Sequence, residues 1–164
     1  MCANCHVVSI DVKLTDLEAI RRAVKRMGWT FNEDQTTYNW NDYWVDDSPV
    51  PRNLFETEEE YKAVVAMSYE GRCSVMNAKL GHCTHALKVP GANYEIGLIQ
   101  RGNEYIPIFD WVHYGGLKAL NQNGMNGFVQ AYTIEKAKLD AQRRGYSVSE
   151  NWQGNTCKLK VRVP

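Results

Sequence analysis

The sequence has no run of apolar residues that approaches the roughly 20 needed to cross a membrane. Its first residues show neither the basic segment nor the apolar core of a secretory signal. Five cysteines in 164 residues are an odd number and too sparse for a disulfide framework. These absences predict a soluble, cytoplasmic protein with reduced thiols and no membrane partner.

The formal net charge is zero, whereas a dedicated nucleic-acid-binding protein is usually basic, so nucleic acid is not an expected partner. The zero hides an asymmetry along the chain. Residues 33–62 carry nine acidic and two basic residues, and residues 125–164 carry seven basic and three acidic ones. Such segments either form separate solvated faces or attract each other or a partner.

The length fits one domain, residues 1–164, and the spacing of apolar residues predicts an α+β fold. Expected strands cover residues 6–13, 29–31, 82–89, 94–100, 104–112, 146–148 and 157–163, with a three-residue hairpin loop at 101–103. Expected helices run from a capping box at Thr15 and Glu18 to Gly28, from Thr57 to about Gly71 as a short inserted helix, and over about 128–144. Short turns between strands favour one curved, mainly antiparallel sheet with the two long helices on one face.

Residues 33–78 are typical of an acidic, aromatic insertion within this domain. Four aromatic residues fall within seven positions and alternate with amide and acidic side chains: Tyr38, Trp40, Tyr43 and Trp44. Aromatic faces beside amide groups suit stacking on a base or sugar. The alternative is that these rings pack the insertion onto the core or into a contact between subunits.

Two loops rich in glycine and asparagine, at 115–116 and 121–127, offer backbone N–H groups near the start of the last long helix, where the helix dipole favours anions. Lys118 lies between these loops, and Arg101 lies at the tip of the neighbouring hairpin. We therefore expect a site for a small anionic ligand, of which a nucleotide is one kind. The expected ligand-binding residues are Tyr38, Trp40, Tyr43, Trp44, Arg101, Trp111, His113 and Lys118.

No Gly-x-Ser-x-Gly or phosphate-loop pattern is present, so no motif fixes a reaction. Asp110 lies in an apolar strand with His113 close after it, which fits either an acid–base pair or a structural carboxylate. Cys73, Cys83 and Cys157 are the candidate nucleophilic thiols, although Cys157 alternates with apolar residues and is expected to pack. The pattern favours a protein without catalytic activity.

Zinc ligands are available in two places. Cys2 and Cys5 have ligand spacing, and His82, Cys83 and His85 cluster near the start of a strand. Strand alternation places His82 on the opposite face from the other two, which favours ordinary strand side chains. The segment from Cys2 also matches a haem-attachment pattern, but that chemistry needs export. No metal or cofactor is therefore expected.

Several short segments carry a resemblance to a known family. They are residues 6–10, 15–17, 27–29, 81–89, 94–98, 102–105, 109–111, Tyr132 and 145–148. In these pieces the chain resembles the hypothetical chloroplast reading frame thirty-five family, a domain of unknown function in plastids, cyanobacteria, other bacteria and phages. The resemblance covers most of the chain except about residues 33–78. It implies the α+β frame and no particular activity.

Three hypotheses about function follow. The first is a non-enzymatic binding protein for a small anionic ligand, forming a homo-oligomer and, if the source is a phage, sequestering a signal nucleotide. The second is an accessory or regulatory protein that docks a macromolecular partner through the acidic insertion. The third is a small enzyme that uses Asp110 and His113.

Overall fold

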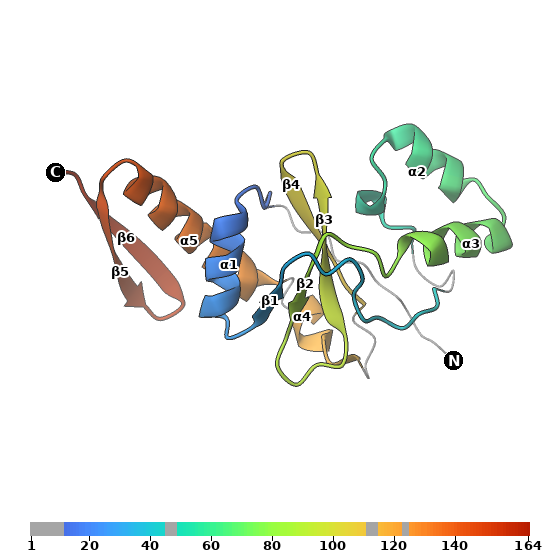
Figure 1. The fold of residues 1–164 in the computed structure, drawn as a ribbon, viewed down its shortest axis with the longest axis horizontal. Coiled ribbons are helices and arrows are strands. Elements are labelled where there is room, and N and C mark those ends of the chain that lie inside the picture. The colour runs from blue at the N-terminus through green and yellow to red at the C-terminus, as the bar shows by residue number, and fades with distance from the viewer. Residues whose placement is uncertain (1–11, 45–48, 111–114, 123–124) are drawn as a thin grey trace.

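Four strands in the middle of the chain form an antiparallel sheet in the computed structural model, which describes residues 12–44, 49–110, 115–122 and 125–164 (Figure 1). The strands are β1 (Thr30–Asn32), β2 (His85–Lys88), β3 (Glu95–Arg101) and β4 (Glu104–Ile108), paired in that order. The protein is thus an α+β protein, and these four strands fall within or next to the expected ranges. The strand expected at 6–13 lies mostly outside the described residues; just after it, Leu14 forms an isolated bridge to Tyr105.

The turn between β3 and β4 is one residue shorter than predicted. Arg101 pairs with Glu104, so only Gly102 and Asn103 lie between the paired strands. Gly102 has φ +57°, as a type II′ turn requires at its first central position. Arg101 therefore belongs to the strand, and strand alternation fixes the direction of its side chain.

Helix α1 (Leu17–Arg26) starts from Asp16 rather than from the predicted Thr15. The Asp16 carboxylate accepts a hydrogen bond from the Ala19 N–H at 3.1 Å, and aspartate caps a helix as well as threonine does. The N–H of Thr15 instead donates to the Tyr132 hydroxyl at 2.9 Å. Glu18 pairs with Arg22 one turn along the helix, so the predicted capping box does not form.

Helix α5 (Asn126–Arg143) packs along α1, and both helices share a core with one face of the sheet. Ile20 of α1 and Phe128 of α5 belong to the same buried cluster as Leu87, Ile96 and Leu98 of the strands. The short helix α4 (Lys118–Gln122) follows Leu117, which is also buried in this cluster. None of the described helices is long and apolar enough to cross a membrane.

The other face of the sheet is covered by the predicted insertion. Its segments are a 3-10 turn, η1 (Arg52–Leu54), and two helices, α2 (Glu58–Val65) and α3 (Tyr69–Lys79). A second buried cluster joins their apolar side chains, among them Phe55 and Met76, to Ala86 and Ile108 of the sheet. The sheet is therefore buried on both faces.

The prediction of one short helix from Thr57 to about Gly71 is wrong at its end. The Thr57 hydroxyl does cap α2, accepting from the Glu60 N–H at 3.1 Å. However, α2 ends at Val65, and Ser68 caps the separate helix α3 by accepting from the Gly71 N–H at 3.3 Å. Serine is a preferred N-cap residue, so Ser68 marks the start of a second helix and Gly71 lies in its first turn.

The last two strands do not join the first sheet. Strands β5 (Ser147–Gln153) and β6 (Thr156–Arg162) pair only with each other among the described residues, so the prediction of a single sheet is wrong. This hairpin contacts α5 and projects beyond α1 and α5, at the opposite end of the molecule from α2 (Figure 1).

Candidate functional site

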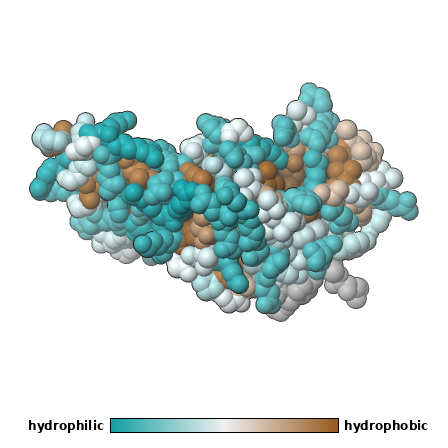
Figure 2. Space-filling model, in the orientation of Figure 1, coloured by the Kyte–Doolittle hydropathy of each residue, from teal (hydrophilic) through white to brown (hydrophobic). Residues whose placement is uncertain are grey.

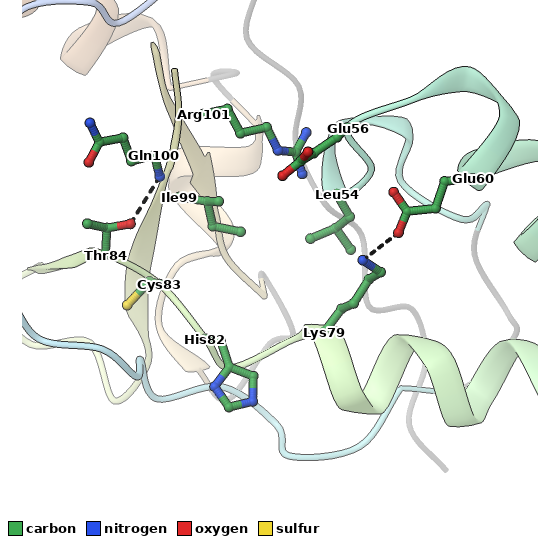
Figure 3. A pocket seen from close by; sticks show the side chains of 10 residues that line it. All are labelled: Leu54, Glu56, Glu60, Lys79, His82, Cys83, Thr84, Ile99, Gln100 and Arg101. Atoms are coloured by element: carbon green, nitrogen blue, oxygen red, sulfur yellow. Dashed lines mark hydrogen bonds and ion pairs between the residues drawn. The ribbon is translucent and has the colours of Figure 1, made fainter. Parts of the chain in front are cut away.

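A cavity of about 490 Å³ opens between the sheet and the insertion (Figure 3). Its apolar lining comes from Leu54 and Ile99, and its charged lining comes from Arg101, Lys79, Glu56 and Glu60. A volume of this size lies within the range of small-molecule sites, about 300–1,000 Å³. The cavity therefore has the size and the mixed lining of a binding site.

Arg101 reaches this cavity because of its place in strand β3. Side chains two residues apart lie on the same face of a strand, so Ile99 and Arg101 face the insertion (Figure 3), as does Gly97, which lies against the Tyr38 ring. The two-residue turn that follows holds Arg101 in the strand pairing at its last position. Lys79 comes from the last residue of α3, and Glu60 comes from the first turn of α2.

The Arg101 guanidinium is half-buried and only partly satisfied. One of its nitrogens, Nη1, donates to the Phe55 carbonyl oxygen at 3.0 Å, and Arg101 makes no ion pair with any described residue. Burial lowers the pKa of the Arg101 guanidinium from its ordinary value, and an arginine side chain remains charged at neutral pH. The cavity therefore contains a fixed cation with N–H donors to spare.

Lys79 is better compensated than Arg101. Its Nζ lies 2.9 Å from a Glu60 carboxylate oxygen, and it sits 5.0 Å from the centre of the Phe55 ring. The hydrogen bond from Lys79 lowers the pKa of Glu60, so this carboxylate is ionised at neutral pH. Glu56 adds a second carboxylate at the wall near Arg101 (Figure 3).

Cys83 also lines the cavity, but it is not an activated nucleophile. Burial, with the nearby charge of Glu95, raises the pKa of the Cys83 thiol to about 11. Its Sγ donates to the Gln35 carbonyl oxygen at 3.1 Å. A thiol needs a lowered pKa to attack a substrate at neutral pH, so Cys83 has the opposite of the required environment.

The aromatic residues of the insertion are mostly core residues. Tyr38, Trp40 and Trp44 are buried in the second cluster, and only Tyr43, at 51% exposure, faces solvent. The Tyr38 ring lies so close to the backbone of Gly97 that a β-carbon there would come within 2.4 Å of it. The structure thus matches the packing alternative for these three rings, and they do not line the cavity.

Of the remaining expected ligand-binding residues, Lys118 is described and lies away from the cavity. Lys118 is exposed at the start of α4. The preceding residue, Leu117, belongs to the first buried cluster, which lies on the other face of the sheet. Trp111 and His113 lie outside the described residues, so the Asp110–His113 pair cannot be placed, although Asp110 itself is buried. Among the predicted residues that the structure describes, Arg101 alone lines the cavity.

Two groups of residues were considered as zinc ligands from the sequence: Cys2 with Cys5, and His82, Cys83 and His85. Cys2 and Cys5 lie outside the described part of the chain, within which no cluster of three or more metal-ligating side chains occurs. His82 is exposed, whereas His85 is buried between the rings of Phe31 and Tyr105. The Nδ1 of His85 accepts the Asp34 N–H at 3.0 Å, which is the bond of an ordinary packed histidine.

Glu56, Glu60 and Lys79 were missed as site residues from the sequence. They come from segments far from Arg101 along the chain, and only the packing of α2 and α3 on the sheet brings them together. Gly97 could have indicated from the sequence that the insertion packs on this strand, because a glycine inside a strand often marks the close approach of another group.

No family model, no curated protein and no solved structure matches the chain. The resemblance to the hypothetical chloroplast reading frame thirty-five family therefore stays a prediction from the sequence.

Proposed function

We propose that this protein binds a small anionic ligand, without catalysis, in the cavity between the sheet and the insertion. The observation that carries the proposal is the half-buried Arg101 guanidinium, which has one hydrogen-bond acceptor and no ion pair among the described residues. A guanidinium has five N–H donors in a planar fork that matches a carboxylate or phosphate. An anion at this position would satisfy donors that the described part of the protein leaves open.

The carboxylates of the cavity narrow the choice of ligand. Glu56 and Glu60 balance the charges of Arg101 and Lys79. The net electrostatic attraction of the whole cavity for a small anion without other functional groups is therefore weak. A ligand with one compact anionic group and several hydrogen-bond donors fits better, because the donors can face the carboxylates. A nucleotide has this combination, and Leu54 and Ile99 offer apolar surface to its base.

A thermal-shift screen with inorganic phosphate, mononucleotides and dinucleotides tests this proposal. A ligand at about 100 times its dissociation constant stabilises the folded protein by about 2.7 kcal/mol, which raises Tm by several degrees. The variant Arg101→Gln should weaken binding by about 10- to 100-fold, since a hydrogen bond to a charged group contributes about 1.5–3 kcal/mol.

The matched control is Arg144→Gln, which removes an exposed arginine outside the cavity lining. It should leave the shift unchanged, and Arg101→Lys should restore only part of the binding because a lysine lacks the planar fork. If no compound shifts Tm, or if both glutamine variants lose the shift equally, the cavity is not the anion site.

A second candidate function rests on the exposed surface of the insertion. Val65, Met67 and Tyr69 are exposed by 44%, 38% and 51%, and they surround the turn between α2 and α3. Figure 2 shows apolar surface at this end of the molecule. Together with the acidic residues of α2, this patch supports the docking of a macromolecular partner. Val65→Glu should abolish such docking and leave ligand binding intact, whereas Arg101→Gln should do the reverse.

A further inference from the structure

The hairpin formed by β5 and β6 has two chemically different faces. Residues directly opposite each other in an antiparallel pair share a face of the ribbon. The register pairs Val148 with Val161 and Glu150 with Leu159 on one face, and it pairs Ser149 with Lys160 on the other. The first face is the one that packs on the body of the protein, since Glu150 bonds to Arg26 of α1 and Lys138 of α5.

Every side chain on the second face, the outer face, is polar and exposed. It comprises Ser147, Ser149, Asn151, Gln153, Thr156, Lys158, Lys160 and Arg162. This face has three cations and no carboxylate. No acidic residue follows Glu150 in the sequence, so none flanks the cations along β6.

These three cations are uncompensated within the described structure. Lys158, Lys160 and Arg162 form no ion pair with any described residue, whereas the cations of α5 do. Lys136 and Arg143, for example, both pair with Asp16 and Asp140. The positive field of the outer face is therefore not cancelled locally.

The spacing of the cations suits a row of phosphates. Alternate residues of an antiparallel strand lie about 6.8 Å apart, so the three side chains follow one another at regular steps along one face. A two-stranded ribbon also has the width that the major groove of B-form DNA admits. The neighbouring serine, asparagine and glutamine side chains have the donors and acceptors that reach phosphates and base edges.

We propose that the outer face of the β5–β6 hairpin binds the phosphate backbone of double-stranded DNA, with the ribbon seated in the major groove. The site is separate from the cavity that contains Arg101. Three of the seven basic residues in positions 125–164 lie on this face, where no described carboxylate pairs with them.

A second copy of the chain is a less suitable occupant of this face. The acidic insertion is the counterpart of opposite charge that the sequence offers, and part of its charge is already paired. Glu58 bonds to Arg52 at 2.8 Å, and Glu60 bonds to Lys79 at 2.9 Å. Lysines along an open strand also discourage the pairing of one edge with another.

Fluorescence anisotropy with a labelled DNA duplex of about 20 base pairs tests the proposal over about 50–200 mM salt. Three phosphate contacts predict a slope of about −2.7 for log K against log salt, which is about a 40-fold loss of affinity over this range. The variant Lys158→Gln/Lys160→Gln/Arg162→Gln should lose most of this dependence and at least about tenfold in affinity at the lowest salt. The single variant Lys160→Gln should reduce the slope by about 0.9.

The charge-matched control is Lys62→Gln/Lys88→Gln/Lys118→Gln, whose three lysines are exposed elsewhere on the molecule. It should bind DNA like the wild type, and so should Arg101→Gln, which separates this site from the cavity. The proposal is overturned if the wild type does not bind at the lowest salt, or if both triple variants lose affinity equally. It is also overturned if the wild type self-associates in sedimentation and does not bind DNA, and the variant Lys158→Gln/Lys160→Gln/Arg162→Gln loses this self-association. Because Lys158, Lys160 and Arg162 are exposed, the triple variant should keep the wild-type Tm. If its Tm is lowered, the DNA affinity of the single variant Lys160→Gln decides the question instead.

Discussion

One carboxylate of the hairpin, that of Glu150, forms ion pairs with both α1 and α5. Glu150 lies 2.5 and 3.0 Å from two nitrogens of Arg26, and 2.9 Å from the Nζ of Lys138. The Trp152 indole N–H also donates to it, at 3.0 Å. We predict that Glu150→Gln destabilises the docked hairpin, because Arg26 and Lys138 lose the carboxylate on the hairpin and keep only Glu135 of α5 as a shared partner among the described residues, while the shape of the side chain is kept.

The expected magnitude follows from the proton equilibrium of this group. Hydrogen bonds from Arg26, and then from Lys138, lower the pKa of Glu150 from 4.5 to about 2. This difference in pKa sets an upper limit of about 3.5 kcal/mol, at about 1.4 kcal/mol for each pH unit. The side chains of Arg26, Glu150 and Lys138 are 27%, 19% and 23% exposed, so water screens part of the attraction. We expect a loss of about 1–2 kcal/mol, between the values for exposed and buried pairs.

The pH dependence has a definite sign. Since the folded-state pKa of Glu150 lies below its unfolded-state value, the contribution is complete above about pH 4.5. It decreases as the pH falls through the folded-state pKa of about 2, and it is lost below that pH, where the carboxylate is protonated in both states. The difference in stability between wild type and Glu150→Gln should therefore be smaller at about pH 3 than at pH 7.

Hydrogen exchange of the β5 and β6 amides measures this local opening directly, and chemical denaturation measures the global free energy of unfolding. Glu59→Gln is the control, since Glu59 is exposed on α2 and forms no ion pair with a described residue. It should change stability by less than about 0.5 kcal/mol. An unchanged exchange rate in Glu150→Gln at pH 7, or a penalty that persists undiminished at low pH, would refute the reasoning.

Two further predictions concern the second core and the cavity thiol. Gly97→Ala should cost about 1–3 kcal/mol, because the new methyl group meets the Tyr38 ring at 2.4 Å, and thermal melts should show a lower Tm. The matched Gly127→Ala in α5 meets only the Met27 methyl at 3.4 Å and should raise Tm; equal effects would contradict the packing. The rate at which Cys83 reacts with iodoacetamide, followed by peptide mapping, should rise with a midpoint near pH 11. A midpoint near the ordinary 9.0 would show that the thiol is not buried as described.

Local patterns predicted the elements of this fold better than their assembly. Thr57 was recognised as a helix cap, and the strands around 85–88, 95–101 and 104–108 were expected, because caps and alternation are properties of neighbouring residues. Helix α3 was missed because its apolar face is short and Gly71 falls in its first turn. The separation of β5 and β6 from the other strands was missed because alternation does not tell which strands pair.

The residues of the candidate site likewise divide into one that a local pattern predicted and others that only the packing brings together. Arg101 was predicted because a hairpin tip is visible in the sequence. Glu56, Glu60 and Lys79 join it only through the packing of the insertion, which no local pattern specifies. The rings of Tyr38, Trp40 and Trp44 have the composition of a stacking site, but burial depends on what lies beneath them, and here that is a sheet with glycine at position 97.

The burial of the sheet on both faces changes what the segment 33–78 is. Ala86, Gly97 and Ile108 present a flat apolar surface that needs a cover, and the rings and helices of this segment are that cover. A chain shortened to the remaining elements would expose this surface and would be prone to aggregate. The segment is therefore not a detachable appendage but an integral half of the foldable unit, and any shorter relative would need a different lining for the same three strands.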